Sequence, residues 1–319
     1  MPIAQWIEHW FPEPVIPVQV RMGTNLDFLM NSNINKLYKL MEKCSVCPRN
    51  CGINRLKGEV GFCKSTNEIK VASINLHKGE EPPISGNNGS GTIFFSNCNL
   101  SCVFCQNYPI SQLGNGYVLT TKQLADKMIE LQVKGAHNIN FVTPSHMYPL
   151  MAESIFIAKQ KGLKIPILSN CSGYESVKVL ELMEDFIDIY MPDMKYSSNE
   201  NAKKYSQVDN YTEINQLAIR EMFRQKGELT FNNDGVAQKG LLIRHLVLPN
   251  NISGSKKIFD FISSEISKDT FVSVMAQYHT ANKSDKIEEL NRKITEHEYD
   301  DVVDYFYEVG LHNGWVQGL

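Results

Sequence analysis

Three cysteines stand close together in the phrase C-N-L-S-C-V-F-C, directly after the apolar run GTIFFSN. One loop can therefore carry the thiols of Cys98, Cys102 and Cys105. Thiolates are the usual ligands of iron–sulfur clusters, and a cubane of four irons needs four ligands when it is fully closed. Three thiolates predict a four-iron, four-sulfur cluster with one open iron, which a small molecule bearing an amine and a carboxylate can chelate.

A structural zinc site is the competing interpretation of these cysteines. Zinc would need a fourth ligand, such as Cys171 or a histidine. Zinc knuckles usually contain two Cys-x-x-Cys pairs, and a single Cys-x3-Cys-x2-Cys loop behind a strand does not follow that pattern. We therefore favour the cluster.

A second cysteine group lies upstream. Cys44, Cys47, Cys51 and Cys63 supply four thiolates, enough to close either a tetrahedral zinc site or a second cluster. Thiolates serve both metals, so both interpretations stay open. A second cluster would relay electrons toward the first, whereas zinc would hold together a segment too short to fold alone.

The elements that must position these groups follow a βα pattern. Short apolar runs alternate with longer amphipathic stretches from Gly91 onward, which is typical of a parallel sheet. The predicted strands are 91–97, 138–144, 164–170, 186–193, 240–249 and 269–277, and the predicted helices are 121–135, 154–162, 176–186, 213–227 and 256–267. Six alternations are fewer than the eight of a closed barrel. We predict an α/β fold, a partial (β/α)6 TIM-like barrel with a small N-terminal cysteine-rich metal module.

Polar residues at the strand ends are the next candidates, because chemistry in such folds collects at the C-terminal ends of the strands. Asp193 and Lys195 are two residues apart and should face the same side, although a surface ion pair is the alternative. Ser169 and Asn170 end the third strand, where by themselves they are an ordinary turn signal.

Arg244 and His245 lie inside an apolar strand, so one must face inward and the other outward. A buried arginine needs an anionic partner, and the carboxylate of a bound cofactor is one candidate. His279 ends the phrase AQYH and could face the barrel mouth, although a lone histidine is more often a structural residue.

The cysteine spacing, with aromatic Phe104 just before the last cysteine, resembles the signature of the radical S-adenosylmethionine (SAM) superfamily. From about Cys44 onward the chain resembles its pyruvate formate-lyase activating enzyme-like branch, and specifically the uncharacterised members with an N-terminal cysteine module. The phrases that carry the likeness are CPRNCGINRLKGEVGFC, EEPPISG, GSGTIFFSNCNLSCVFCQN, NFVTPSH, MPDMKY and AQYH.

This resemblance implies roles for individual residues. Asp193 and Lys195 would contact the ribose and carboxylate of SAM, Ser169 and Asn170 would add polar contacts, and Phe104 would belong to the cofactor site. Branch members often carry a Gly-Gly-Glu-Pro type sequence after the second strand, where this chain reads V-T-P-S-H. Here Thr143 would present its hydroxyl and backbone to the amino group.

The resemblance also implies an activity. SAM would be cleaved reductively to a 5′-deoxyadenosyl radical, which takes a hydrogen atom from a backbone glycine of a glycyl-radical enzyme. The cofactors would be a 4Fe-4S cluster and SAM, and the electron donor a flavodoxin or ferredoxin. The alternatives are radical modification of another peptide or a small metabolite, and a non-catalytic iron–sulfur electron carrier.

Composition limits the partners and the location. The 319 residues carry a formal net charge of -3 from 32 basic and 35 acidic side chains, which are interleaved along the chain. This pattern predicts no binding to nucleic acid or anionic lipid. No apolar run approaches the length of about 18 residues that spans a bilayer, and a signal-peptide pattern is missing. We expect a cytoplasmic protein with reduced cysteines.

Three regions are expected along the chain. Residues 1–40 are predicted to be a poorly ordered extension, and residues 1–22 resemble the conceptual translation of a transfer-RNA gene, so translation could begin at Met22, Met30 or Met41. The cysteine-rich module and a Gly- and Pro-rich connector occupy 41–85. The radical SAM core with its C-terminal helices occupies 86–319.

Overall fold

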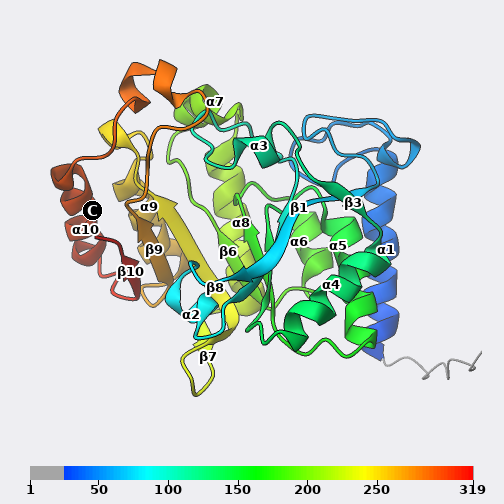
Figure 1. The fold of residues 1–319 in the computed structure, drawn as a ribbon. Coiled ribbons are helices and arrows are strands. Elements are labelled where there is room, and N and C mark those ends of the chain that lie inside the picture. The colour runs from blue at the N-terminus through cyan, green and yellow to red at the C-terminus, as the bar shows by residue number, and fades with distance from the viewer. Residues whose placement is uncertain (1–24, 319) are drawn as a thin grey trace, which may run out of the picture.

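A parallel sheet forms the centre of the fold in the computed structural model, which describes residues 25–318. All six predicted strands are present and lie side by side in the order β9-β8-β6-β5-β4-β2. Their bounds are β2 (Ser90–Phe95), β4 (Ile139–Val142), β5 (Ile167–Cys171), β6 (Ile189–Pro192), β8 (Ala237–Leu246) and β9 (Phe271–Met275). The sheet keeps two free edges (Figure 1). The prediction of an α/β partial TIM-like barrel is confirmed.

Four further strands extend the sheet beyond the prediction. They are β1 (Ile69–His77) and β3 (Tyr117–Leu119) beyond β2, β7 (Thr230–Phe231) against β8, and β10 (Gly314–Val316) parallel to β9. Three of them have two or three residues, too few to show a hydrophobic period. Because β1 pairs with β2, the sheet also includes residues 69–77, which lie in the segment expected to form the module and connector.

Helices cover the outer face of the sheet (Figure 1). They include α4 (Thr121–Val133), α5 (Tyr148–Gln160), α6 (Val177–Met183), α8 (Tyr211–Lys226), α9 (Ser255–Phe261) and α10 (Glu296–Glu308). The chain also forms α2 (Pro82–Ser85), α3 (Tyr108–Ser111), α7 (Asn199–Ser206), the 3-10 turns Arg55–Lys57, Pro249–Asn251, Ser284–Lys286 and Glu288–Leu290, and the π turn Ile262–Ile266. Helix α4 begins at a capping box between Thr120 and Gln123, which satisfies two backbone donors that the first turn leaves free.

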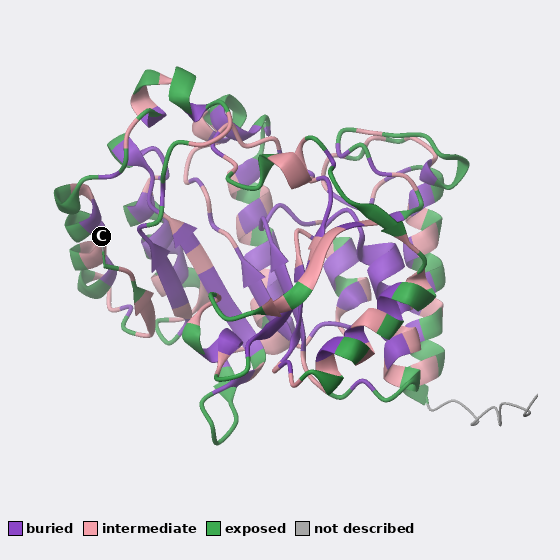
Figure 2. Cartoon of the chain, in the orientation of Figure 1, coloured by how far each residue is buried: buried purple, intermediate pink, exposed green. Residues whose placement is uncertain are grey.

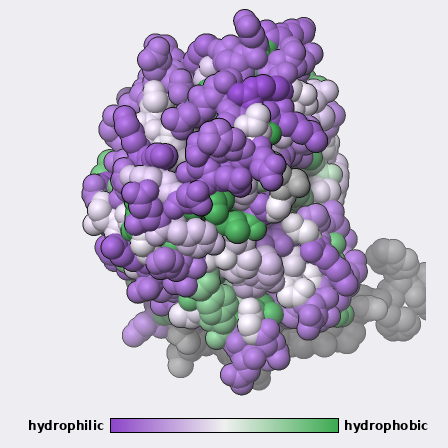
Figure 3. Space-filling view, turned by 90° about the vertical axis from the view of Figure 1, so that its left-hand side faces the viewer, coloured by the Kyte–Doolittle hydropathy of each residue, from purple (hydrophilic) through white to green (hydrophobic). Residues whose placement is uncertain are grey.

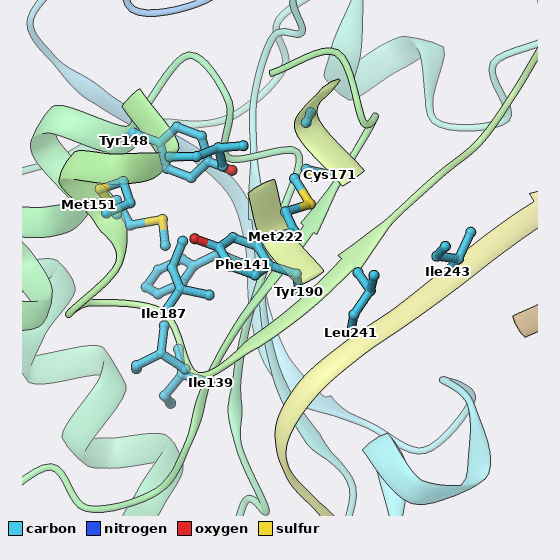
Figure 4. Packing of buried hydrophobic residues seen from close by; sticks show 14 of the residues in the cluster. Ile139, Phe141, Tyr148, Met151, Cys171, Ile187, Tyr190, Met222, Leu241 and Ile243 are labelled. Atoms are coloured by element: carbon cyan, nitrogen blue, oxygen red, sulfur yellow. The ribbon is translucent and has the colours of Figure 1, made fainter. Parts of the chain in front are cut away.

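The main core lies between the sheet and these helices (Figure 2). In Figure 4, Phe141 of β4 and Tyr190 of β6 lie with Met151 of α5 and Met222 of α8 in this cluster. Side chains alternate along a strand, so the neighbours of these residues face the barrel interior. The lower interior is filled by a separate apolar cluster that includes Ile84, Leu168, Ile189, Met191 and Leu242. The connector helix α2 therefore plugs one end of the barrel with Ile84.

The N-terminal region departs from the prediction. Residues Asn25–Glu42 form an 18-residue helix, α1, that packs against α5 and α6. It buries Leu37 and Met41 completely, and the Tyr38 hydroxyl donates to Glu153 of α5. The expectation of a poorly ordered extension is therefore wrong for 25–40, because one face of this stretch is apolar and finds a partner. Residues 1–22 lie outside the described residues.

The helices and the surface can be compared with what a membrane-spanning segment requires. Within residues 25–318, the structure has no helix that combines the length and apolar character needed to cross a membrane. The side of the molecule drawn in Figure 3, which carries α10 and β10, is mostly hydrophilic with small separate apolar spots.

Candidate active site

The loop with Cys98, Cys102 and Cys105, here called the triad loop, follows β2 at the C-terminal edge of the sheet. Its thiols accept or share hydrogen bonds with nearby groups: Leu100 N lies 3.3 Å from Cys98 Sγ, Ser206 Oγ 3.0 Å from Cys102 Sγ, and Ser111 Oγ 3.1 Å from Cys105 Sγ. Backbone bonds from residues 101 and 103 to the end of α7 hold the loop in place. The triad is thus built into the fold.

The electrostatics show that the three thiols are neighbours. Burial raises the pKa of Cys98, and the adjacent Cys102 and Cys105 raise it further. Burial also raises the pKa of Cys102 to about 11, although Lys195 opposes this shift. Without metal the thiols of Cys98 and Cys102 are therefore protonated near neutral pH, and a bound cation is what would hold them as thiolates.

Asp193, Lys195, Arg244 and Asn170 form one connected group beside the triad. Lys195 Nζ pairs with Asp193 Oδ2, Arg244 Nε lies 3.0 Å from Asp193 Oδ1, and Arg244 donates to Asn170 Oδ1 at 2.8 Å. The Asp193 and Lys195 side chains are only 14% and 20% exposed, so this is not a surface ion pair. Of the adjacent pair Arg244 and His245, Arg244 is the residue that faces inward, and it forms an ion pair with Asp193.

The second face of β8 carries His245. Its ring nitrogens lie 2.7 Å from Met194 O and 2.8 Å from Ser255 Oγ, and the side chain is fully buried. Burial lowers its pKa to about 4, so it stays neutral. The alternation predicted for Arg244 and His245 is present.

Glu80 joins the group from the connector, and sequence reasoning missed it. Its carboxylate lies 3.8 Å from the Arg244 guanidinium, and its side chain is 9% exposed. Burial raises its pKa, although Arg244 works in the opposite direction. The only available signal was its place in the phrase EEPPISG, because contact with Arg244 requires the connector to cross the barrel.

Ser169 points away from the polar group, whereas Thr143 ends its strand in an unusual backbone conformation. Ser169 is on the opposite face of β5 from Asn170, where its hydroxyl is 3.0 Å from the Tyr148 hydroxyl of α5; the structure does not bring its side chain to the polar group. Thr143 follows β4 with a φ of 60°, a left-handed conformation that is a genuine outlier for a β-branched residue. Such outliers cluster at functional sites.

Aromatic residues pack against Phe104 of the triad loop. Phe104 is buried and makes edge contacts with Tyr196 and Tyr278, at ring-centroid distances of 6.4 and 6.1 Å. His279, one residue beyond Tyr278, is exposed, and its Nδ1 lies 3.1 Å from Nε2 of Gln106. The segment after β9 therefore reaches across the barrel mouth to the triad loop.

Cys171 does not lie with the triad. It ends β5 on the helix side, in the apolar cluster of Figure 4, and is 2% exposed. Burial and the neighbouring Glu175 raise its pKa. The structure thus does not offer Cys171 as the fourth ligand of a zinc site.

Comparison with known proteins decides the family. The family model described as "Radical SAM superfamily" matches residues 92–232. The uncharacterized protein MJ0674 of Methanocaldococcus jannaschii is 31% identical over 282 residues, covering 84% of this chain and 75% of that protein. The chain belongs to the radical SAM superfamily. A second relative from the same organism, MJ0808, is 23% identical over 247 residues, covering 72% of this chain and 68% of that protein.

A solved structure is also similar to this radical SAM enzyme. The FeFe-hydrogenase maturase HydG from Carboxydothermus hydrogenoformans aligns with a TM-score of 0.48 at 15% identity over 69% of this chain. The chain spans 51% of that protein. Superfamily membership supports SAM-dependent radical chemistry with a 4Fe-4S cluster, and such enzymes generally need an electron donor such as flavodoxin or ferredoxin.

The triad fits the cluster that the superfamily implies. Its donors are three neighbouring thiols, and the adjoining polar group offers cations and an amide for a ligand on an open iron. Within residues 25–318, no three His, Cys, Asp or Glu side chains converge in the arrangement that holds one metal ion. The sulfurs around a cubane stand further apart than those around a single zinc, which all lie about 2.3 Å from one point.

The upstream quartet of this radical SAM enzyme folds into a compact module. The pKa of Cys47 is raised by burial and also by Cys63 and Cys44, so these three thiols are neighbours. Cys51 Sγ accepts a hydrogen bond from the backbone N–H of residue 62 at 3.5 Å. A Cβ on Gly61 would lie 2.7 Å from Cys51 Sγ, so the glycine makes room for that thiol. The structure thus brings the thiols of Cys44, Cys47 and Cys63 near one another within this segment.

Proposed function

We propose that this radical SAM enzyme abstracts a hydrogen atom from a backbone glycine of a partner protein and so activates a glycyl-radical enzyme. The cluster, when bound, supplies the electron that splits SAM into methionine and a 5′-deoxyadenosyl radical. The observation that carries the proposal is the proximity of the triad to the ion pair of Lys195 with Asp193. Lys195 is close enough to Cys102 for each to shift the other's pKa.

The polar group supports binding of an amino-acid carboxylate. Burial works to lower the pKa of Lys195, but Asp193 and Cys102 hold it above its ordinary value, so the ammonium is charged. Arg244 is charged as well. These two cations face Asp193 and Glu80, and burial disfavours the charged form of Glu80. Lys195 and Arg244 can both pair with the SAM carboxylate through charge-assisted hydrogen bonds.

The backbone at Thr143 supports binding of the amino group. The strained turn places Thr143 at the end of β4, beside Asn170, whose backbone oxygen accepts from Thr143 N at 2.8 Å. A left-handed residue turns its own carbonyl and hydroxyl out of the strand ladder, where they can accept hydrogen bonds. The side chains of Phe104, Tyr196 and Tyr278 shield the loop from water on its other side.

A cavity of about 700 Å³ at the ends of β9 and β10 supports a peptide substrate. This volume lies within the usual range for ligand pockets. Its lining is mixed: Gln277, His279, Lys293 and Glu296 supply polar groups of both charge signs, and Tyr278 and Ile294 supply apolar surface. Such a lining can contact both the amide groups and the apolar side chains of a peptide loop.

The test uses anaerobically reconstituted enzyme with dithionite, SAM and a glycyl-radical enzyme whose glycines carry deuterium at Cα. We expect one deuterium in the 5′-deoxyadenosine and a glycyl radical signal in the partner. Unlabelled 5′-deoxyadenosine without that signal would favour another peptide or metabolite. If SAM stays intact while the cluster is reduced, the chain is an electron carrier and the proposal fails.

A further inference from the structure

The upstream module contacts the triad loop on both sides of Cys98. Asn97 precedes it and Asn99 follows it in the triad loop. Asn97 Nδ2 donates to Ser65 Oγ at 3.0 Å, and Arg49 Nε donates to the backbone oxygen of Asn99 at 2.9 Å. Both partners belong to the upstream module. We call these two contacts the Cys98 clamp.

Arg49 is held rigidly within the module. It lies between Cys47 and Cys51, and its guanidinium carbon is 3.6 Å from the ring centroid of Phe62. Tyr174 lies 5.7 Å away, and its backbone oxygen accepts from Asn99 Nδ2 at 2.9 Å. A planar guanidinium can stack on a ring and donate in its own plane at once, which lysine cannot do.

One cavity is lined by a cysteine from each of the two groups. Cys63, the last thiol of the quartet, and Cys98, the first of the triad, both line a cavity of about 400 Å³. Lys64 Nζ crosses the same region to donate to the backbone oxygen of Gln112 at 3.3 Å. The module is therefore docked directly against the triad loop.

We propose that Cys44, Cys47, Cys51 and Cys63 hold a second, redox-active iron–sulfur cluster, and that the Cys98 clamp couples it to the triad. The inference rests on the proposed function, because it assigns the electron route to that site. An external one-electron carrier reduces the quartet cluster, which passes one electron to the triad and returns to its oxidised form. The triad would then transfer this electron to SAM, and the electron is consumed as SAM is cleaved.

Zinc in the quartet is the outcome that competes with this proposal. Zinc has no redox chemistry, and a metal that only folds the module needs no contact with the triad loop. The clamp instead holds the residues on each side of Cys98, and Cys63 and Cys98 line the same cavity. This arrangement favours a role in electron transfer.

The experiment compares metal content and magnetic coupling in the full chain, reconstituted anaerobically. We expect about eight irons and no zinc per chain. In Cys98→Ala/Cys102→Ala/Cys105→Ala, about four irons should remain with a reducible signal. With both clusters reduced, the electron paramagnetic resonance signal of the triad should relax faster than in Cys63→Ser. One zinc per chain, or a triad signal unchanged by the quartet, overturns the proposal.

Arg49→Lys tests the clamp without touching a cysteine. It keeps the charge but loses the Nε donor and the ring stacking, so we expect both clusters to assemble and the triad's reduction potential to shift. Arg224→Lys, an exposed arginine in ion pairs with Glu184 and Glu221, is the matched control and should not shift it. An unchanged potential in Arg49→Lys would contradict the role of the clamp. None of these measurements needs SAM, so they are independent of the proposed reaction.

Discussion

Arg244 of β8 and Asp193 at the end of β6 are paired twice, by a backbone bridge between adjacent strands and by a 3.0 Å hydrogen bond from Nε to Oδ1. The register of two parallel strands thus places the guanidinium over the carboxylate. Lys195 approaches the same carboxylate from its other oxygen. The pairing keeps two cations charged in a partly enclosed mouth beside the triad.

Arg244→Gln should weaken SAM binding by at least about tenfold, equal to about 1.4 kcal/mol. The substitution removes a charged donor that is 18% exposed. Arg224→Gln removes an exposed arginine far from the mouth and serves as the control. Anaerobic calorimetric titration with SAM measures both, and equal affinities for the two variants would remove Arg244 from the site.

Cys102→Ala should abolish release of 5′-deoxyadenosine, because the cluster would lose one of three protein ligands. Cys171→Ala should retain the activity and lose about 1 kcal/mol of unfolding free energy, since this thiol lies in the apolar core. Nucleoside release by chromatography and denaturant unfolding compare the two. Loss of the cluster in Cys171→Ala would make that residue a ligand after all.

Thr143→Gly should be more stable than Thr143→Ala by about 1 kcal/mol. Glycine adopts a φ of 60° without a side-chain clash, whereas the Cβ of alanine still disfavours this left-handed conformation. Denaturant unfolding of the two variants gives the difference. If alanine proves as stable as glycine, residue 143 does not keep the left-handed conformation in solution.

Glu175→Gln should remove a pH dependence of stability between about pH 4.5 and 8. Burial raises the pKa of Glu175 to about 8, although its bonds to Ser145 and Cys171 oppose this. The folded state therefore binds the proton more tightly than the unfolded state, and the contribution is lost as pH rises through this window, by up to about 1.4 kcal/mol per pH unit.

The buried histidines act in the opposite sense, so wild type must be compared with the glutamine variant at each pH. Burial lowers the pKa of His146 and His245 to about 4. Their contribution is full above about pH 6.5 and is lost as pH falls toward 4. Between pH 6.5 and 8 the histidine contribution is constant, and a wild-type stability as flat as that of Glu175→Gln there would contradict the raised pKa.

Leu37→Ala should lower the free energy of unfolding by about 2–5 kcal/mol. The side chain is fully buried in the contact of α1 with the main core. Leu26→Ala, on the exposed side of α1, is the control and should stay within about 0.5 kcal/mol of wild type. A similar small change for both residues would show that α1 does not dock.

Much of this site could be predicted from the spacing of residues along the sequence. Cys98, Cys102 and Cys105 lie within eight residues, so their convergence depends on one loop and could be predicted without the fold. The same holds for Asp193 and Lys195, whose spacing of two on a strand end places them on one side. Such features survive any arrangement of the surrounding elements.

Other parts of the site depend on contacts between distant segments. Ser169 and Asn170 are adjacent in sequence, yet only the packing of β5 against α5 decides that Asn170 meets Arg244 and Ser169 meets Tyr148. Glu80 reaches Arg244 across 164 residues because the connector crosses the barrel. Alternation predicts that two neighbours face opposite sides but not which side each one faces.

The sequence by itself determined the βα order, the three-thiol loop and the four-thiol module, because hydrophobic period and ligand spacing are local properties of the chain. Only the tertiary structure decided that α1 docks on the barrel and that Cys171 lies away from the triad. It also decided that Arg49 donates a hydrogen bond to the backbone of the triad loop. Those outcomes depend on which apolar faces bury one another, and that burial is settled by the whole chain at once.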